Sequence, residues 1–231
     1  MRKLVVFLIF VLAVVVAADR GLHYAAQNEI AKRISGRYEM AAEPEVTIAG
    51  FPFLNQAFSG EYQRIRVVTG ALTIQEVQLE RVDATLREVD APIGDLMTRP
   101  KVTANSVDAS VLLPYSELQK RLPEGIVIET ENGTPRITGD LAMGQFSAPV
   151  ESDLDVSVDE SGIVHVSPSN LEAGDAPIDL GSAQDRLTLS FEIPPLPFGL
   201  RITDIEALPN GVQLTGNASD VSVVGDLEAQ K

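Results

Sequence analysis

The hydrophobic pattern of the chain begins with one uninterrupted apolar run near the N-terminus. Arg2 and Lys3 precede the run, which extends from Leu4 to Ala18, and Asp19 and Arg20 end it. At about 1.5 Å per residue the run makes a helix of roughly 22 Å, whereas the core of a bilayer is about 30 Å thick. This length favours a signal peptide cleaved before Asp19, with an uncleaved membrane anchor as the alternative. In both cases the leading positive charges predict that the rest of the chain is exported from the cytoplasm.

The segment after this run has the period of a helix. Leu22, Ala26, Ile30, Ile34 and Tyr38 recur every four residues, which predicts a narrow apolar stripe on an otherwise polar helix. Packing against the core of the domain is the favoured interpretation of this stripe. A helix that lies against a membrane or lines a lipid cavity is the alternative.

Residues 50–60 form a short phenylalanine-rich segment bounded by glycines. Pro52 suits the first position of a helix, because its missing N–H needs no partner there. Helical spacing would then place Phe51, Leu54 and Phe58 on one face. Such a cluster either plugs the core or forms the rim of an apolar pocket, and the plug is the favoured interpretation.

Most of the remaining chain alternates between apolar and polar residues, as half-buried strands do. Asn210-Gly211 is a strong two-residue hairpin signal, and the turn from Asp159 to Gly162 predicts a second hairpin. The alternation fits antiparallel pairing with one wet face. The expected strands lie at residues 45–48, 62–68, 77–86, 102–108, 126–128, 137–143, 147–158, 163–167, 187–193, 200–205 and 212–224.

Helices are expected at few other places. Ser116 can cap a short helix that contains Leu118 and Leu122 and ends at Pro123. The alternating strand–helix rhythm of a parallel sheet does not appear in the sequence. The fold class is therefore expected to be α+β, with residues 1–18 as signal peptide or membrane anchor and residues 19–231 as a single domain.

Composition narrows the classes of function. The chain has 231 residues and a formal net charge of -15, which argues against nucleic-acid binding because that needs a basic face. The same acidity argues against docking on anionic lipid head groups by charge alone, but not against apolar capture of a lipid tail. Cysteine is absent from the sequence, which excludes structural disulfides, thiolate catalysis and cysteine-ligated zinc.

Patterns that carry catalytic or metal chemistry are scarce. The sequence has two distant histidines, His23 and His165, and it contains no HExxH pair, Walker loop or G-x-S-x-G elbow. A calcium site is conceivable at the best acidic cluster, but a solvated strand face is the favoured interpretation, and no cofactor or metal is expected. That cluster consists of Glu151, Asp153, Asp155 and Asp159.

The loop from Pro194 to Leu200 is apolar and rich in proline, with Leu196, Phe198 and Leu200 as its large side chains. Solvated loops are usually polar. This loop therefore either folds over the core or forms an apolar lip at a lipid entrance.

Three stretches behind the signal-like segment together resemble a known family. They are Gly50-Phe51-Pro52-Phe53-Leu54 with the strand after it, Val82-Asp83-Ala84-Thr85-Leu86, and Leu196-Pro197-Phe198-Gly199-Leu200 running into Asn210-Gly211-Val212. In this order they resemble the LmeA-like phospholipid-binding family of actinobacterial envelopes, over nearly all of the chain beyond the apolar run. The first stretch is the most specific of the three.

The resemblance implies a tubular lipid-binding fold, akin to half of a bactericidal/permeability-increasing protein. In that fold a strongly curved antiparallel sheet wraps around a helix and leaves an apolar groove for acyl chains. It also implies a phospholipid-binding protein of the cell envelope or periplasm that acts at the membrane surface and supports lipomannan-type glycolipid elongation or lipid transfer. Envelope glycolipid-synthesis enzymes would be further partners, and no catalytic residues are implied. The candidate lipid-binding residues are Phe51, Phe53, Leu54, Phe58, Leu196, Phe198 and Leu200.

Two other classes of function stay open. An envelope scaffold protein would expose an apolar patch in place of a cavity. An enzyme that acts on a glycolipid would need carboxylates or a histidine in a cleft, and its candidates are Asp153, Asp155 and His165.

Overall fold

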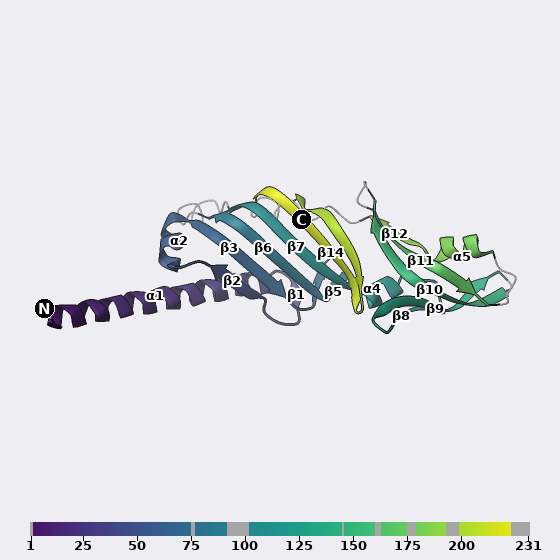
Figure 1. Cartoon of the computed structure of the whole chain (residues 1–231), viewed down its shortest axis with the longest axis horizontal. Helices are drawn as coiled ribbons and strands as arrows, with labels where there is room; N and C mark the ends of the chain where they lie inside the picture. Colours follow the sequence, from purple (N-terminus) through teal and green to yellow (C-terminus); the bar gives the residue numbers. More distant parts are fainter. Residues whose placement is uncertain are drawn as a thin grey trace.

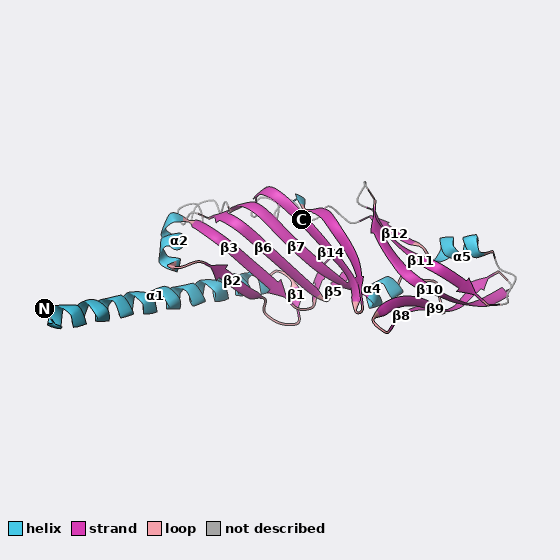
Figure 2. Cartoon of the chain, viewed as in Figure 1, coloured by secondary structure: helices cyan, strands magenta, loops and turns pink. Residues whose placement is uncertain are grey.

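The strands of the chain form three antiparallel sheets in a computed structural model (Figures 1 and 2). The structure describes residues 2–74, 77–91, 102–144, 146–159, 163–174, 179–192 and 199–222. The expected α+β class and antiparallel pairing are confirmed, although the strands divide among three sheets and do not form one.

The largest sheet has six strands, in the order β13 (Arg201–Leu208), β14 (Gly211–Ser222), β7 (Thr103–Pro114), β6 (Arg81–Asp90), β3 (Glu61–Thr69) and β2 (Glu45–Ala49). The second sheet has five, in the order β12 (Leu189–Glu192), β11 (Ile163–Ala173), β10 (Phe146–Val158), β9 (Thr134–Met143) and β8 (Ile126–Glu131). The third sheet is small and consists of β1 (Glu39–Met40), β4 (Leu72–Ile74) and β5 (Val77–Leu79). The two larger sheets follow one another along the long axis of the molecule (Figure 1).

Both expected hairpins agree with the strand pairing. Leu208 of β13 is the register partner of Gly211 of β14, so Asn210 lies in the tight turn between them. Strands β10 and β11 pair antiparallel from Val158 and Val164 onward, and the turn between them includes residues 160–162, which lie outside the described residues.

Helix α1 (Arg2–Ser35) is continuous and carries the apolar run away from the sheets (Figure 1). Most side chains of the run are exposed. Within the described residues, α1 is the one helix long and apolar enough to cross a membrane. The structure therefore shows no helix break at the expected cleavage point between Ala18 and Asp19.

The second half of α1 contacts β2 and α2 (Phe53–Ser59). Ala26, Ile30 and Ile34 of the expected stripe are partly buried, but Leu22 is exposed. Asp19 and Ala31 are the buried residues of this helix. The packed face is thus rotated slightly from the stripe that the apolar residues alone indicate.

The main buried core belongs to the five-stranded sheet and the adjoining end of the six-stranded sheet. Two short helices, α4 (Tyr115–Gln119) and α5 (Leu180–Leu187), contribute to it. Leu118 of α4 and Ala183 and Leu187 of α5 are fully buried. Helix α4 begins after Pro114, so the expectation of Ser116 as its cap was wrong.

Helix α5 was missed by the sequence pattern, which placed Leu187 at the start of a strand. Its local cause is clear in the structure: the Asp179 side chain accepts a hydrogen bond from the Ser182 backbone N–H at 2.7 Å, which is an N-terminal cap. The same bond lowers the pKa of Asp179 below its usual value. Ala183 and Leu187, four residues apart, then face the core together.

Candidate lipid-binding surface

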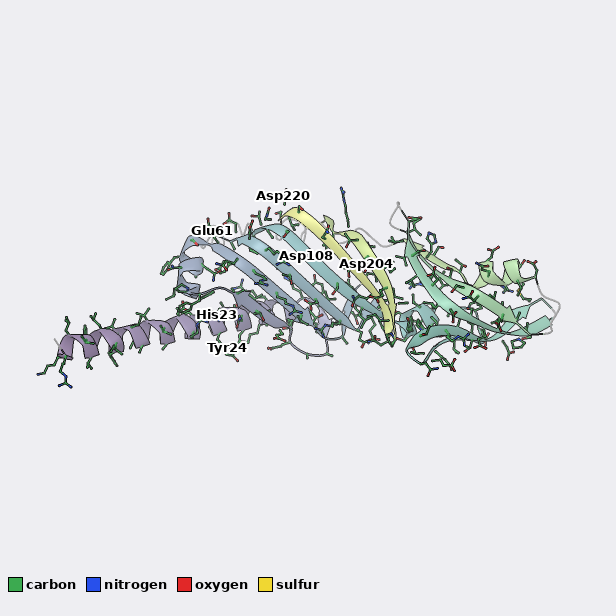
Figure 3. The ribbon with its side chains drawn as sticks, in the orientation of Figure 1. His23, Tyr24, Glu61, Asp108, Asp204 and Asp220 are labelled. Carbon is green, nitrogen blue, oxygen red and sulfur yellow. The ribbon has the colours of Figure 1, made fainter. Side chains whose placement is uncertain are left out.

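The six-stranded sheet has one polar face. In the strand register Arg66 pairs with Thr85 and Thr85 with Asp108, across β3, β6 and β7. Arg66 Nη2 lies 2.5 Å from Asp83 Oδ2, and Arg87 Nη2 lies 3.2 Å from Asp108 Oδ2. The hydrogen bond from Arg66 outweighs partial burial and lowers the pKa of Asp83. Figure 3 shows Asp108 on this sheet, and the paired charges fit a face that is in water.

The opposite face of the same sheet is apolar and incompletely covered at its centre. Val67 pairs with Ala84 and Ala84 with Ala109, while Val82 pairs with Val111. All five side chains are partly exposed, and none belongs to either buried cluster of the domain. We refer to these five residues as the apolar strip.

The apolar strip lies between two well-packed regions. Along β7, Val107 belongs to one buried cluster and Leu113 to the other, and the strip residues of that strand fall between them. At the β2 edge, Val46 and Ile48 are buried beside α1. The strip is therefore a gap in the covering of the sheet, flanked by apolar side chains, and it suits a flexible hydrocarbon chain better than a polar ligand.

An open pocket of about 820 Å³ lies where α2 meets β3 and β6. Phe58 and Tyr62 line it together with Glu61, Glu88 and Asp90. Partial burial raises the pKa of Tyr62. Glu61 marks this end of the sheet in Figure 3. Carboxylates accept hydrogen bonds, so the pocket suits hydroxyl or ammonium groups better than a bare phosphate.

The phenylalanines of the α2 region do not share one face. Phe53 is 5% exposed and lies 5.3 Å from His23, ring centre to ring centre. Phe51 and Phe58 are 64% and 82% exposed. The favoured interpretation of this cluster as a plug of the core was wrong for Phe51 and Phe58, because both are exposed and Phe51 precedes the helix. Phe53 is the phenylalanine of the segment that is buried against α1. Leu54 is partly buried.

Asp19 joins α1 to α2, which sequence reasoning missed. Its side chain is nearly fully buried, and Oδ1 accepts a hydrogen bond from the Leu54 backbone N–H at 2.8 Å. Arg20 Nη2 lies 2.6 Å from Asp19 Oδ2 and compensates the charge. A carboxylate at the start of a helix satisfies N–H groups that have no partner within the helix. The available signal was its place as the first charge after the apolar run.

The proline-rich loop is described only at its end. Leu200 is partly buried and packs against the cluster that contains Val89 and Val107. Leu196 and Phe198 lie outside the described residues, so their part in a lipid entrance stays a prediction.

The acidic cluster of β10 is an ion-paired strand face. Arg136 Nη1 contacts Glu151, and Arg136 Nε lies 3.2 Å from Asp153 Oδ1. Asn170 donates a hydrogen bond to Asp153 from the neighbouring strand. Within the described part of the chain, no group of three or more histidine, cysteine or acidic side chains is arranged to hold a metal ion. Arg136 therefore pairs with two of the four carboxylates, and Asp159 contacts His165 instead.

His165 lies between a serine and an aspartate. Its Nδ1 is 2.9 Å from Ser190 Oγ, and its Nε2 is 3.2 Å from Asp159 Oδ2. These residue types match a nucleophilic triad, but none of them lines the pocket beside α2, and Ser190 is exposed on the outer surface of a strand. A triad needs a site that excludes water and orients the substrate, so this contact alone does not indicate catalysis.

A long apolar N-terminal helix, an antiparallel α+β domain and a partly exposed apolar strip are together compatible with the class of lipid-binding proteins. The model of the LmeA-like phospholipid-binding family matches residues 17–217. The chain therefore belongs to the LmeA-like phospholipid-binding family, and this membership supports a lipid-binding role. No curated protein and no solved structure matches the chain.

Proposed function

We propose that the chain binds phospholipid by holding an acyl chain on the apolar strip. The observation that carries this proposal is the half-covered row of Val67, Ala84 and Ala109 in a sheet whose neighbouring apolar residues are buried. Small side chains at residues 84 and 109 leave room for a hydrocarbon chain. The family membership supports the same ligand class.

The free energy gained by removing an acyl chain from water is large enough for binding to an apolar surface. Removing one methylene from water contributes about 0.8 kcal/mol, so a chain of about 14–16 carbons contributes around 10 kcal/mol before the costs of binding. This gain needs no basic site, and it therefore suits a chain with a net charge of -15. The head group would then lie near the pocket beside α2, where carboxylates can accept hydrogen bonds from hydroxyl groups.

The proposal includes the finer form of the fold and the location. The six-stranded sheet would curve around α1 and the acyl chain, as in a tubular lipid-binding fold. Packing of α1 against β2 supports this arrangement. The domain would lie outside the cytoplasm at the surface of the membrane, because α1 begins with positive charges and a long apolar run.

The direct test is photo-crosslinking of the full chain in vesicles that contain a phospholipid with a photoreactive group on its acyl chain. We expect crosslinks in peptides from β3, β6 and β7, mapped by mass spectrometry after digestion. Peptides from the apolar run of α1 serve as the internal positive control. Crosslinks confined to α1 would refute the acyl-chain site on the sheet.

Two filling variants sharpen the test. Ala84→Trp and Ala109→Trp occupy the strip without adding charge, and we expect each to reduce crosslinking to the sheet several-fold. Thr85→Trp is the matched control, because Thr85 is next in sequence to Ala84 and lies on the polar face. An equal loss in all three variants would point to general disturbance of β6 and would count against the strip.

We further propose that the bound lipid is presented to envelope enzymes that elongate lipomannan-type glycolipids, or is transferred between membranes. A deletion strain should then make glycolipids of altered length, measured by gel electrophoresis and mass spectrometry. The wild-type chain should restore the length and Ala84→Trp should not. Restoration by Ala84→Trp would separate this cellular role from the apolar strip.

A further inference from the structure

The exposed aromatic edge of α2 lies beside the point where the apolar run ends. The Arg20 guanidinium lies 4.9 Å from the centre of the Phe51 ring, and Asp19 is hydrogen-bonded to the backbone of Leu54. Both contacts involve the first two residues after the run. A lipid bilayer that surrounds the run therefore ends at the level of α2.

We propose that α1 is retained as a membrane anchor, and that Phe58 of α2 and Phe51 just before it insert into the surface of the leaflet from which α1 emerges, with Asp19 holding α2 at that depth. The occupant of this docking surface is the lipid interface, not another protein. The inference concerns how the domain is docked and would stand even if the sheet held no acyl chain.

The length of the apolar run supports close approach of the domain. A helix of roughly 22 Å is shorter than a bilayer core of about 30 Å. Such a segment thins the bilayer locally and draws its flanking residues into the interface. Residues 19–23, and the α2 backbone bonded to them, would then lie among the lipid head groups.

The chemistry of the edge favours apolar insertion over electrostatic attraction. Phe58 is the most exposed large hydrophobic side chain of the described residues, at 82%. Aromatic rings partition well into the interface. The nearby pocket carries Glu61, Glu88 and Asp90, so attraction to anionic lipids would contribute little. Phe53 faces inward and anchors α2 to the domain.

Asp19 fixes the position of α2 relative to the apolar run, and therefore the depth of α2 in the membrane. The carboxylate is buried and caps the α2 backbone from a different helix, and α1 continues without a break on both sides of it. The apolar run, Asp19 and the exposed residues Phe51 and Phe58 are therefore expected to move as one rigid body.

The absence of tryptophan from the sequence provides a clean experiment. The full chain with Phe58→Trp, reconstituted in phosphatidylcholine–phosphatidylglycerol vesicles, should show blue-shifted emission. It should lose most of that emission when the vesicles carry nitroxide-labelled acyl chains. The control is Leu180→Trp, an exposed apolar position on α5, which should keep its emission. Equal quenching of the two reporters, or no quenching of Phe58→Trp, would overturn the proposal.

A second pair of variants tests the hydrogen bond between Asp19 and the Leu54 backbone. In the Phe58→Trp background, Asp19→Ala should reduce the quenching while the chain still floats with the vesicles. Asp19→Asn should largely restore it, because the amide oxygen can still accept the bond from Leu54. Unchanged quenching in Asp19→Ala would show that Asp19 does not set the depth of α2. Circular dichroism of each variant would confirm that the sheets are intact.

Discussion

The two larger sheets use the same alternation of apolar and polar residues but bury their apolar faces to different extents. In the five-stranded sheet, Ile137, Leu141 and Val164 are almost inaccessible. In the centre of the six-stranded sheet, Val67 and Ala109 remain partly exposed. The difference lies in the covering elements, since α4 and α5 complete the core of the first sheet, whereas the described helices cover the strip of the second only in part.

The different coverage of the two sheets suggests that one contributes mainly to folding stability and the other mainly to ligand binding. A sheet face that a helix covers contributes its full apolar area to folding, whereas an uncovered face is available to a ligand. The five-stranded sheet and its helices are therefore expected to hold the fold, and the six-stranded sheet to hold the lipid. The following predictions test that division from the largest expected effect to the smallest.

Leu187→Ala should give the largest loss of stability. The side chain is fully buried in the core beneath α5, and such truncations cost about 3 kcal/mol. Leu180→Ala is the matched control in the same helix, because Leu180 is half exposed, and it should change stability by less than about 0.5 kcal/mol. Urea unfolding of the full chain in detergent micelles measures both. Similar losses would show that α5 is not a cover of the core.

Val164→Ala and Val67→Ala compare the two sheets with one substitution. Val164 is fully buried, so its truncation should cost about 2 kcal/mol, whereas Val67→Ala should cost less than about 1 kcal/mol. The same unfolding experiment separates them. Addition of phospholipid should stabilise the wild type and Val164→Ala alike, and Val67→Ala less. A reversed order would contradict an open strip.

Tyr115→Phe should cost about 1 kcal/mol. The hydroxyl of Tyr115 donates a hydrogen bond of 2.7 Å to the Leu208 carbonyl, linking α4 to the end of β13. Burial raises the pKa of Tyr115 to about 12. The neutral form is thus favoured in the folded chain, so its contribution is complete below about pH 10 and is lost as the pH rises toward 12. Ultraviolet titration should show one tyrosine that ionises last, and Tyr115→Phe should remove that step.

Asp83→Asn on the polar face should have the smallest effect, about 0.5 kcal/mol, because the ion pair with Arg66 is partly in solvent. The pKa of Asp83 is lowered in the fold. Its contribution is therefore present above the unfolded pKa of about 4 and is lost as the pH falls below it. Asp204→Asn, at the edge of the same face, is the control. Unfolding at pH 7 and pH 3, with and without salt, measures the difference.

Alternation was a good guide to the strands and a poor guide to what covers them. The hairpin at Asn210 and the strands around Ile65 and Val156 follow from local signals. Helix α5 was overlooked because an eight-residue helix with two core residues gives little periodic signal. Because α5 was not predicted, the sequence did not indicate that the five-stranded sheet is more completely covered than the six-stranded sheet.

The seven residues predicted to bind lipid stay a prediction, and none of them belongs to the apolar strip. The phenylalanine-rich segment does form a helix, but its inward residue is Phe53, since tertiary contacts with His23 and Tyr62 decide the orientation. The apolar strip was not identified because partial exposure depends on how distant strands pair. Asp19 appeared only as the end of an apolar run, and its bond to Leu54 joins residues 35 apart in the sequence.

Because α1 is one continuous helix, it would also restrict the distance between a membrane that holds its apolar run and the rest of the domain. A flexible linker would let a membrane-tethered domain sample a wide volume, but a helical stem has a fixed reach. With its apolar run in the bilayer, the domain would search for lipids and enzymes by lateral diffusion in two dimensions, at a constant height. Its partners would then be selected by that height as much as by affinity, because only binding sites close to the leaflet gain a high effective concentration.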